Sequence, residues 1–185
     1  MIVVGFDPGI RSVGWAAIAC DLRGGVRLED MGAWNLSVLG PSVGQRLERL
    51  HEESTQLLKK WNPRFVGLEK AVNFKNVDSA FKLSEARAIL RLACYQSLED
   101  MDERLIELSP TAIKKHTTGS GRGTKDEILR ALRMRFTNLE SWVSDSERDL
   151  PHDAFDGLGI AWTTWSQVRQ KIRLGSSMNS LGGSV

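Results

Sequence analysis

Four acidic residues occupy positions from which one α/β fold could bring them together: Asp7, Glu69, Asp153 and Asp156. Asp7 ends an apolar run and is followed by Pro8-Gly9, and Glu69 ends a second apolar run. Asp153 and Asp156 are three residues apart, which places both on one face of a helix. The three aspartates also have structural explanations, because Asp is common before turns and at helix N-termini. Glu69 is the hardest of the four to explain by structure alone, because the apolar strand 65–68 rarely ends in an acid without a reason.

Four converging carboxylates would repel one another unless cations neutralised them. An all-oxygen donor set suits Mg²⁺, with Mn²⁺ as a substitute. Two such ions, about 3.5–4 Å apart, would activate a water and stabilise the leaving oxygen of a phosphodiester. The four residues therefore predict a two-ion site for phosphoryl chemistry.

The charged residues are unevenly distributed, although the formal net charge is only +2. Seven basic and two acidic residues lie between Ser109 and Arg135, whereas six acidic residues and one basic residue lie between Glu140 and Asp156. Separate basic and acidic blocks are typical of a surface that binds a polyanion beside a site that binds cations. Solvated helix faces would also account for any single block.

The 185 residues, 41% of them hydrophobic and 26% charged, predict one folded domain over 1–170 and a flexible Ser/Gly-rich tail over 171–185. No apolar run approaches the roughly 20 residues needed to cross a bilayer, so no membrane association is expected. Two cysteines cannot build a disulfide framework. No signal peptide is recognisable, and a cytoplasmic protein with reduced thiols is expected.

The pattern of apolar runs and turn residues predicts three strands in an antiparallel meander, followed by alternating helices and strands. Cap residues mark several helix starts: Asp78, Ser109 before Pro110, and Thr124. Phe81, Leu83, Ala86, Leu90 and Ala93 are expected on the buried face of the helix that begins at Asp78. The predicted strands are 2–6, 13–20, 26–36, 65–69 and 104–108, and the predicted helices are 43–61, 78–93, a short one from 110, 124–136 and one from about 152.

These elements predict an α/β fold in which a five-stranded mixed sheet is flanked by helices. If the first and fourth strands are neighbours, Asp7 and Glu69 project from the same edge of the sheet, where ligands bind in open α/β sheets.

Three segments resemble the RuvC family of Holliday-junction resolvases. They are Val4-Gly5-Phe6-Asp7-Pro8-Gly9, the stretch from Glu69 through Lys75-Asn76-Val77-Asp78-Ser79-Ala80 to Glu85-Ala86-Arg87, and Asp153-Ala154-Phe155-Asp156-Gly157. Their order and spacing match the family from residue 1 to about 168.

The resemblance implies a ribonuclease H-like fold and a homodimer that cuts four-way DNA junctions by paired symmetric nicks in recombination and repair. It implies magnesium dependence, with metal ligands at Asp7, Glu69, Asp153 and Asp156, and it places active-site or DNA-contacting lysines at Lys114 and Lys125. The branch-migration complex of RuvA and RuvB is a further partner that the resemblance suggests.

We expect the DNA contacts to come from the loop after Glu69 and from the basic segments, through Phe74, Lys75, Asn76, Lys82, Lys115 and Arg122. Some family members carry a base-stacking aromatic three residues after the glutamate, where this chain has Val72. Phe74 either takes that role or packs into the core or the dimer interface, because stacking needs only an aromatic face.

Three other functions are alternatives to junction resolution. A ribosomal-RNA-processing nuclease of the same fold should lack the Lys75–Ala80 segment. An actin-like ATP-binding protein or sugar kinase needs two such domains, more than 185 residues supply. A non-cleaving junction-binding module would gain nothing from four acids that repel phosphate.

Overall fold

A computed structural model describes residues 1–70, 77–140, 143 and 152–181, with side chains described up to Leu174. The predicted roles of Val72, Phe74, Lys75 and Asn76 therefore lie outside the described residues.

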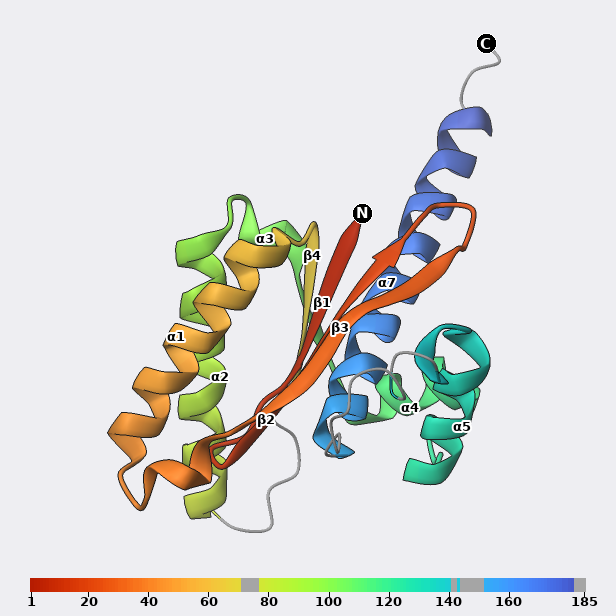
Figure 1. Cartoon of the computed structure of the whole chain (residues 1–185). Coiled ribbons are helices and arrows are strands. Elements are labelled where there is room, and N and C mark those ends of the chain that lie inside the picture. The colour runs from red at the N-terminus through yellow and green to blue at the C-terminus, as the bar shows by residue number, and fades with distance from the viewer. Residues whose placement is uncertain (71–76, 141–142, 144–151, 182–185) are drawn as a thin grey trace.

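The core of the fold is one five-stranded sheet in the order β3-β2-β1-β4-β5 (Figure 1). The first three strands form an antiparallel meander, and β4 and β5 then add parallel to the other side of β1. The predicted five-stranded mixed sheet is thus confirmed, with β1 at its centre. The strands are β1 (Ile2–Asp7), β2 (Ser12–Cys20), β3 (Val26–Asn35), β4 (Phe65–Glu69) and β5 (Leu105–Leu108).

Helices cover both faces of the sheet (Figure 1). One face packs against α1 (Val43–Trp61) and α2 (Val77–Ser97) through a core that includes Val4, Phe6 and Leu50. The long α7 (His152–Leu181) crosses the other face. Three shorter α-helices are α3 (Met101–Arg104), α4 (Pro110–Thr118) and α5 (Lys125–Arg135).

The predicted helix caps are confirmed for α4 and α5. The Ser109 hydroxyl accepts a hydrogen bond from the backbone N–H of Ala112, with Pro110 as the first helical residue. Thr124 and Glu127 form a reciprocal capping box at the start of α5. A one-turn 3₁₀ helix, η1 (Leu36–Leu39), precedes α1.

Several local predictions were wrong. The α2 helix already includes Val77, so Asp78 lies in its first turn, where it pairs with Lys82, and does not cap it. Phe81 is 68% exposed, because it lies on the α2 face that turns away from α1 and the sheet. Arg104 is the last residue of the short helix α3, and β5 begins at the next residue. The guanidinium of Arg104 donates hydrogen bonds to the carbonyls of Pro63, Arg64 and Glu99.

The end of α7 also differs from the expected Ser/Gly-rich tail. The helix continues past Gly175 to Leu181 and projects beyond the sheet (Figure 1). The flexibility of residues 171–185 stays a prediction, because a helical backbone does not report motion.

Glycines let α7 lie directly on the sheet backbone. A Cβ atom on Gly5 of β1 would overlap the backbone of Ala161 in α7, and one on Gly14 of β2 would overlap the carbonyl of Asp153. A Cβ atom on Gly157 of α7 would in turn lie 2.6 Å from the backbone of β2. This close approach brings the first turns of α7 to the end of β1, where Asp7 lies.

Candidate active site

The four predicted carboxylates gather at one edge of the sheet. Parallel pairing of β1 with β4 sets Phe6 beside Leu68, so the next residues, Asp7 and Glu69, leave the sheet side by side. The start of α7 supplies Asp153 and Asp156 from above the same edge. One carboxylate oxygen from each of Asp7, Asp153 and Asp156 lies within 4.8 Å of the other two.

Glu69 joins this group through a hydrogen bond between its side chain and that of Asp7. Burial, this hydrogen bond and repulsion by the neighbouring carboxylates raise the pKa of Asp7 to about 9. Burial also raises the pKa of Glu69, against the opposing effects of the Asp7 hydrogen bond, Arg87 and Lys114. In the absence of a cation, the Asp7–Glu69 pair therefore holds a proton at neutral pH.

The donor set fits a hard divalent cation. All four groups are carboxylates, and three of them converge closely enough to share one ion. The raised pKa of Asp7 is the effect expected for a buried acid among other carboxylates, and a bound cation would oppose it.

Two lysines face the acids from the opposite wall of the site, as the sequence predicts. Lys125, the first residue of α5, places its Nζ 3.2 Å from Oδ2 of Asp156, and this pairing raises the pKa of the lysine. Lys114 of α4 lines the same cleft and holds down the pKa of Glu69. The site thus presents fixed positive charge beside the carboxylates.

Asp7, Glu69 and Asp156 line a cleft of about 320 Å³ together with the two lysines. Its far wall is apolar, because Pro110, Ile113, Ile128 and Ile160 project into it from α4, α5 and α7. A substrate group in this cleft would meet carboxylates on one side and, on the other, two lysines among low-polarity side chains, where electrostatic interactions are stronger than in water.

The other predicted contacts lie away from this cleft. Lys82 is paired with Asp78 at 2.6 Å near the start of α2. Lys115 is exposed on α4, and Arg122 lines a separate groove beyond the 119–123 loop together with Arg130. The structure therefore brings together the four acids, Lys114 and Lys125, but not Lys82, Lys115 or Arg122.

Arg87 is a charged residue near the site to which the sequence analysis assigned no role. Its guanidinium lies 2.7 Å from Glu107 of β5 and lowers the pKa of Glu69. It belongs to the Glu85-Ala86-Arg87 segment, and its position three residues before the buried Leu90 was the available signal that it faces inward. No such signal was available for the close contacts of Gly5, Gly14 and Gly157. These contacts depend on how α7 packs against the sheet.

Comparison with known proteins places this arrangement among nucleases. The family model described as crossover junction endodeoxyribonuclease RuvC matches residues 3–164. A protein of that name from Thermotoga petrophila is 32% identical over 174 residues, which cover 92% of this chain and 96% of the relative. The corresponding protein of Thermosipho melanesiensis is 29% identical over 170 residues, covering 91% of this chain and 99% of the relative.

Solved structures share the fold. RuvC of T. thermophilus in complex with a Holliday junction substrate superimposes with a TM-score of 0.76 at 22% identity, covering 92% of this chain and 96% of that one. The yeast mitochondrial Holliday junction resolvase Ydc2 gives a TM-score of 0.60 at 17% identity, covering 95% of this chain and 83% of that one.

Proposed function

The chain belongs to the family of the crossover junction endodeoxyribonuclease RuvC, and we propose on this basis that it resolves four-way DNA junctions by hydrolysing phosphodiester bonds. The observation that carries the proposal is the gathering of Asp7, Glu69, Asp153 and Asp156 at one sheet edge beside two lysines. A module that only bound DNA would gain nothing from four acids in its binding cleft.

We propose Mg²⁺ as the cofactor, with two ions per subunit and Mn²⁺ as a substitute. Asp7, Glu69, Asp153 and Asp156 would hold the ions, and Asp7 is central to this set because it contacts Glu69 and lies close to the two acids of α7. When bound, divalent cations supply an activated water and neutralise the charge that develops on the phosphate.

The protein groups have separable tasks in this reaction. The carboxylates fix the position of the ions, and the proton held by the Asp7–Glu69 pair must leave before both can act as ligands. Lys125 is close enough to the acids to exchange its partner Asp156 for a phosphate oxygen when cations and DNA are bound. Lys114 adds positive charge on the same side, where it would stabilise the negative charge of the transition state.

A homodimer would supply the second active site that paired nicks require, since the described part of one subunit carries one such acidic cluster. The support is an apolar surface on α2: Val77, Phe81, Leu92 and Tyr95 are 71%, 68%, 47% and 45% exposed. Together with the exposed Ala88, these residues are spaced by three, four or seven positions along the helix. They therefore share one face of α2. This face also includes Arg91, which is exposed.

The remaining roles are proposals for the full complex with DNA. The segment that contains Phe74, Lys75 and Asn76 would contact the junction, with Lys82, Lys115 and Arg122 binding phosphates further out. The RuvA–RuvB branch-migration complex is a proposed partner, and a cytoplasmic enzyme fits two free, buried cysteines. Among the described residues no helix is long and apolar enough to cross a membrane.

A synthetic mobile four-way junction tests the proposal. Incubated with the protein and Mg²⁺, it should be nicked at matching positions on two opposing strands, whereas linear duplex of the same sequence stays intact. Cleavage of duplex and junction at equal rates, or no cleavage of either with Mg²⁺ or Mn²⁺, would overturn it.

A further inference from the structure

A second cleft, of about 740 Å³, opens at the end of the sheet that carries the acids. It lies between the β1–β2 turn, the start of α1 and the first turns of α2, and Arg11, Arg46 and Lys82 line it. Neither Arg11 nor Arg46 was among the DNA contacts predicted from the sequence.

The cleft carries an excess of positive charge. Its one lining acid, Asp78, is already paired with Lys82, and no carboxylate of the described residues lies within ion-pair distance of Arg11 or Arg46. The Arg46 Nη2 atom donates to the carbonyl of Gly40, which fixes its guanidinium at the rim. The Nε atom of Arg46 has no acceptor among the described residues.

The backbone around the cleft adds to this charge. The 19-residue helix α1 starts at Val43, which lines the cleft, and carries no acid in its first turn. The positive end of its dipole therefore faces the same space as the arginines. An anion bound here would meet two guanidinium groups and a helix N-terminus together.

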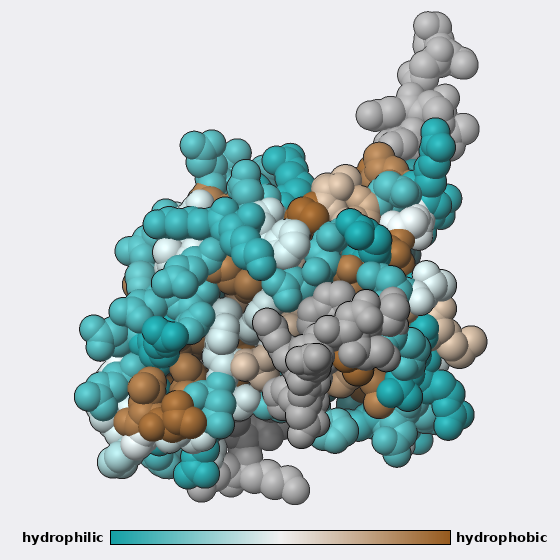
Figure 2. All heavy atoms as spheres, in the orientation of Figure 1, coloured by the Kyte–Doolittle hydropathy of each residue, from teal (hydrophilic) through white to brown (hydrophobic). Residues whose placement is uncertain are grey.

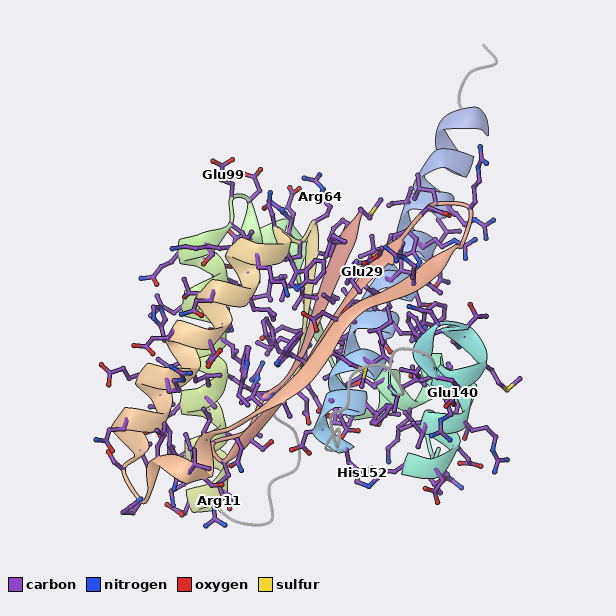
Figure 3. The ribbon with its side chains drawn as sticks, viewed as in Figure 1. Arg11, Glu29, Arg64, Glu99, Glu140 and His152 are labelled. Carbon is purple, nitrogen blue, oxygen red and sulfur yellow. The ribbon has the colours of Figure 1, made fainter. Side chains whose placement is uncertain are left out.

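The cleft lies within reach of a DNA strand held at the acids. Arg11 follows Asp7 by four residues, which span at most about 14 Å of extended chain. That length corresponds to about four nucleotides at a rise of ~3.4 Å each. In Figure 3, Arg11 and His152, the neighbour of Asp153, lie at the same end of the sheet, whereas Arg64 lies at the other.

We propose that Arg11, Arg46 and Lys82 form a phosphate-binding site that holds the junction strand within about four nucleotides of the scissile bond. The inference rests on the proposed function, and it gives these residues the task of positioning the strand over the carboxylates. It also gives Lys82 a defined DNA contact, because binding of a phosphate would release it from Asp78.

Arg11→Gln is the variant that tests the site, because the Arg11 side chain is exposed and its removal leaves the fold intact. The matched control is Arg64→Gln, an exposed arginine at the opposite end of the sheet. Binding to a labelled four-way junction is measured without metal over a range of salt concentrations. Arg11→Gln should bind several-fold more weakly, and its plot of log affinity against log salt should be shallower by about one unit, while Arg64→Gln matches the wild type.

Neutral methylphosphonate linkages, placed one at a time on either side of the mapped nick, identify the phosphate. At one position within four nucleotides, the neutral linkage should weaken binding by the wild type and have no further effect on Arg11→Gln. Equal salt slopes for Arg11→Gln and Arg64→Gln would overturn the phosphate-binding site. Additive losses of binding at every methylphosphonate position would overturn it as well. Neither result would affect junction cleavage by the wild type. A wild type that does not cleave the junction would instead overturn the proposed function, and this inference with it.

Discussion

Asp7 is the residue on which the chemistry depends most, because it lies between Glu69 and the acids of α7. Asp7→Asn keeps the shape of the side chain but removes its charge. We expect cleavage to fall by at least ~100-fold, since loss of a ligand costs more than the 10–100-fold typical of outer-shell partners. Junction binding, measured by gel shift, should be retained. Cleavage near the wild-type rate would exclude Asp7 from the site.

The same residue should make the stability of the metal-free protein depend on pH. The pKa of Asp7 is about 9 in the fold, against 3.8 for an unperturbed aspartate, so the folded state holds this proton more tightly than the unfolded state. Stability from this group is therefore greatest below about pH 4 and is lost as pH rises towards 9.

Asp7→Asn removes that dependence. In EDTA the variant should be more stable than the wild type by about 1 kcal/mol or more at pH 8.5, a rise of ~2–4 °C in Tm, and the difference should shrink towards pH 5. Thermal unfolding at the two pH values measures this. A difference that does not change with pH would mean that Asp7 ionises normally.

Lys125 tests the positive side of the cleft. Lys125→Gln should slow cleavage by roughly 10–100-fold, because a charge that pairs with Asp156 is no longer available to a phosphate oxygen. Single-turnover cleavage of a prebound junction separates this loss from weaker binding. Lys171→Gln, an exposed lysine on α7, is the control. Equal rates for the two variants would make Lys125 a bystander.

The four acids could be proposed from their places at strand and helix ends, whereas Lys114 and Lys125 were proposed from the resemblance to the RuvC family. The structure brings these six residues to one edge of the sheet. Arg11 and Arg46 could not be found in this way. They are distant in the sequence, and only the packing of the β1–β2 turn against α1 brings them to one cleft.

The elements position the site through the contact between α7 and the sheet. Gly5→Ala places a methyl group against the α7 backbone, which cannot move away as a side chain could. We expect a loss of about 1–3 kcal/mol or more in the free energy of unfolding, together with loss of cleavage. Chemical denaturation of both proteins measures the first effect.

Gly44→Ala is the matched control for this prediction. Gly44 lies in the first turn of α1 with no atom within 4 Å of an added Cβ, so alanine should stabilise the protein slightly, by up to about 1 kcal/mol. Equal stabilities for Gly5→Ala and Gly44→Ala would show that the close approach of α7 is not required.

Element boundaries followed the sequence closely where local chemistry determines them. The helix at 43–61 and the strand at 65–69 have the predicted ends, because Asn62-Pro63 ends the helix and Glu69 ends an apolar run. Long-range contacts decided the exceptions: Phe81 follows the apolar spacing of a buried residue, yet α1 and the sheet leave that face of α2 exposed.

The whole molecule presents a largely hydrophilic surface in the view of Figure 2, where an apolar patch covers the region of η1 and the start of α1. Val38 of η1 is 75% exposed. The apolar face of α2 is the surface that we assign to the second subunit, because junction resolution requires two sites related by two-fold symmetry.

Phe81→Glu should disrupt that dimer without unfolding the subunit, since Phe81 is 68% exposed. Sedimentation at micromolar concentration should show a dimer for the wild type and a monomer for the variant. Leu22→Glu, a substitution of a 51% exposed leucine in the β2–β3 turn, is the control and should stay dimeric. A wild type that is monomeric both alone and on the junction would exclude the interface.

On the proposed mechanism, two metal-dependent sites in one complex cut opposing strands of one junction. A supercoiled plasmid that extrudes a cruciform tests this directly, because two nicks within one complex give linear plasmid and a single nick gives an open circle. With Mg²⁺ and the wild-type protein, linear plasmid should form as the main early product, and Asp7→Asn should form neither product. Accumulation of open circles without linear plasmid would contradict paired cleavage and would indicate a nuclease that nicks one strand at a time.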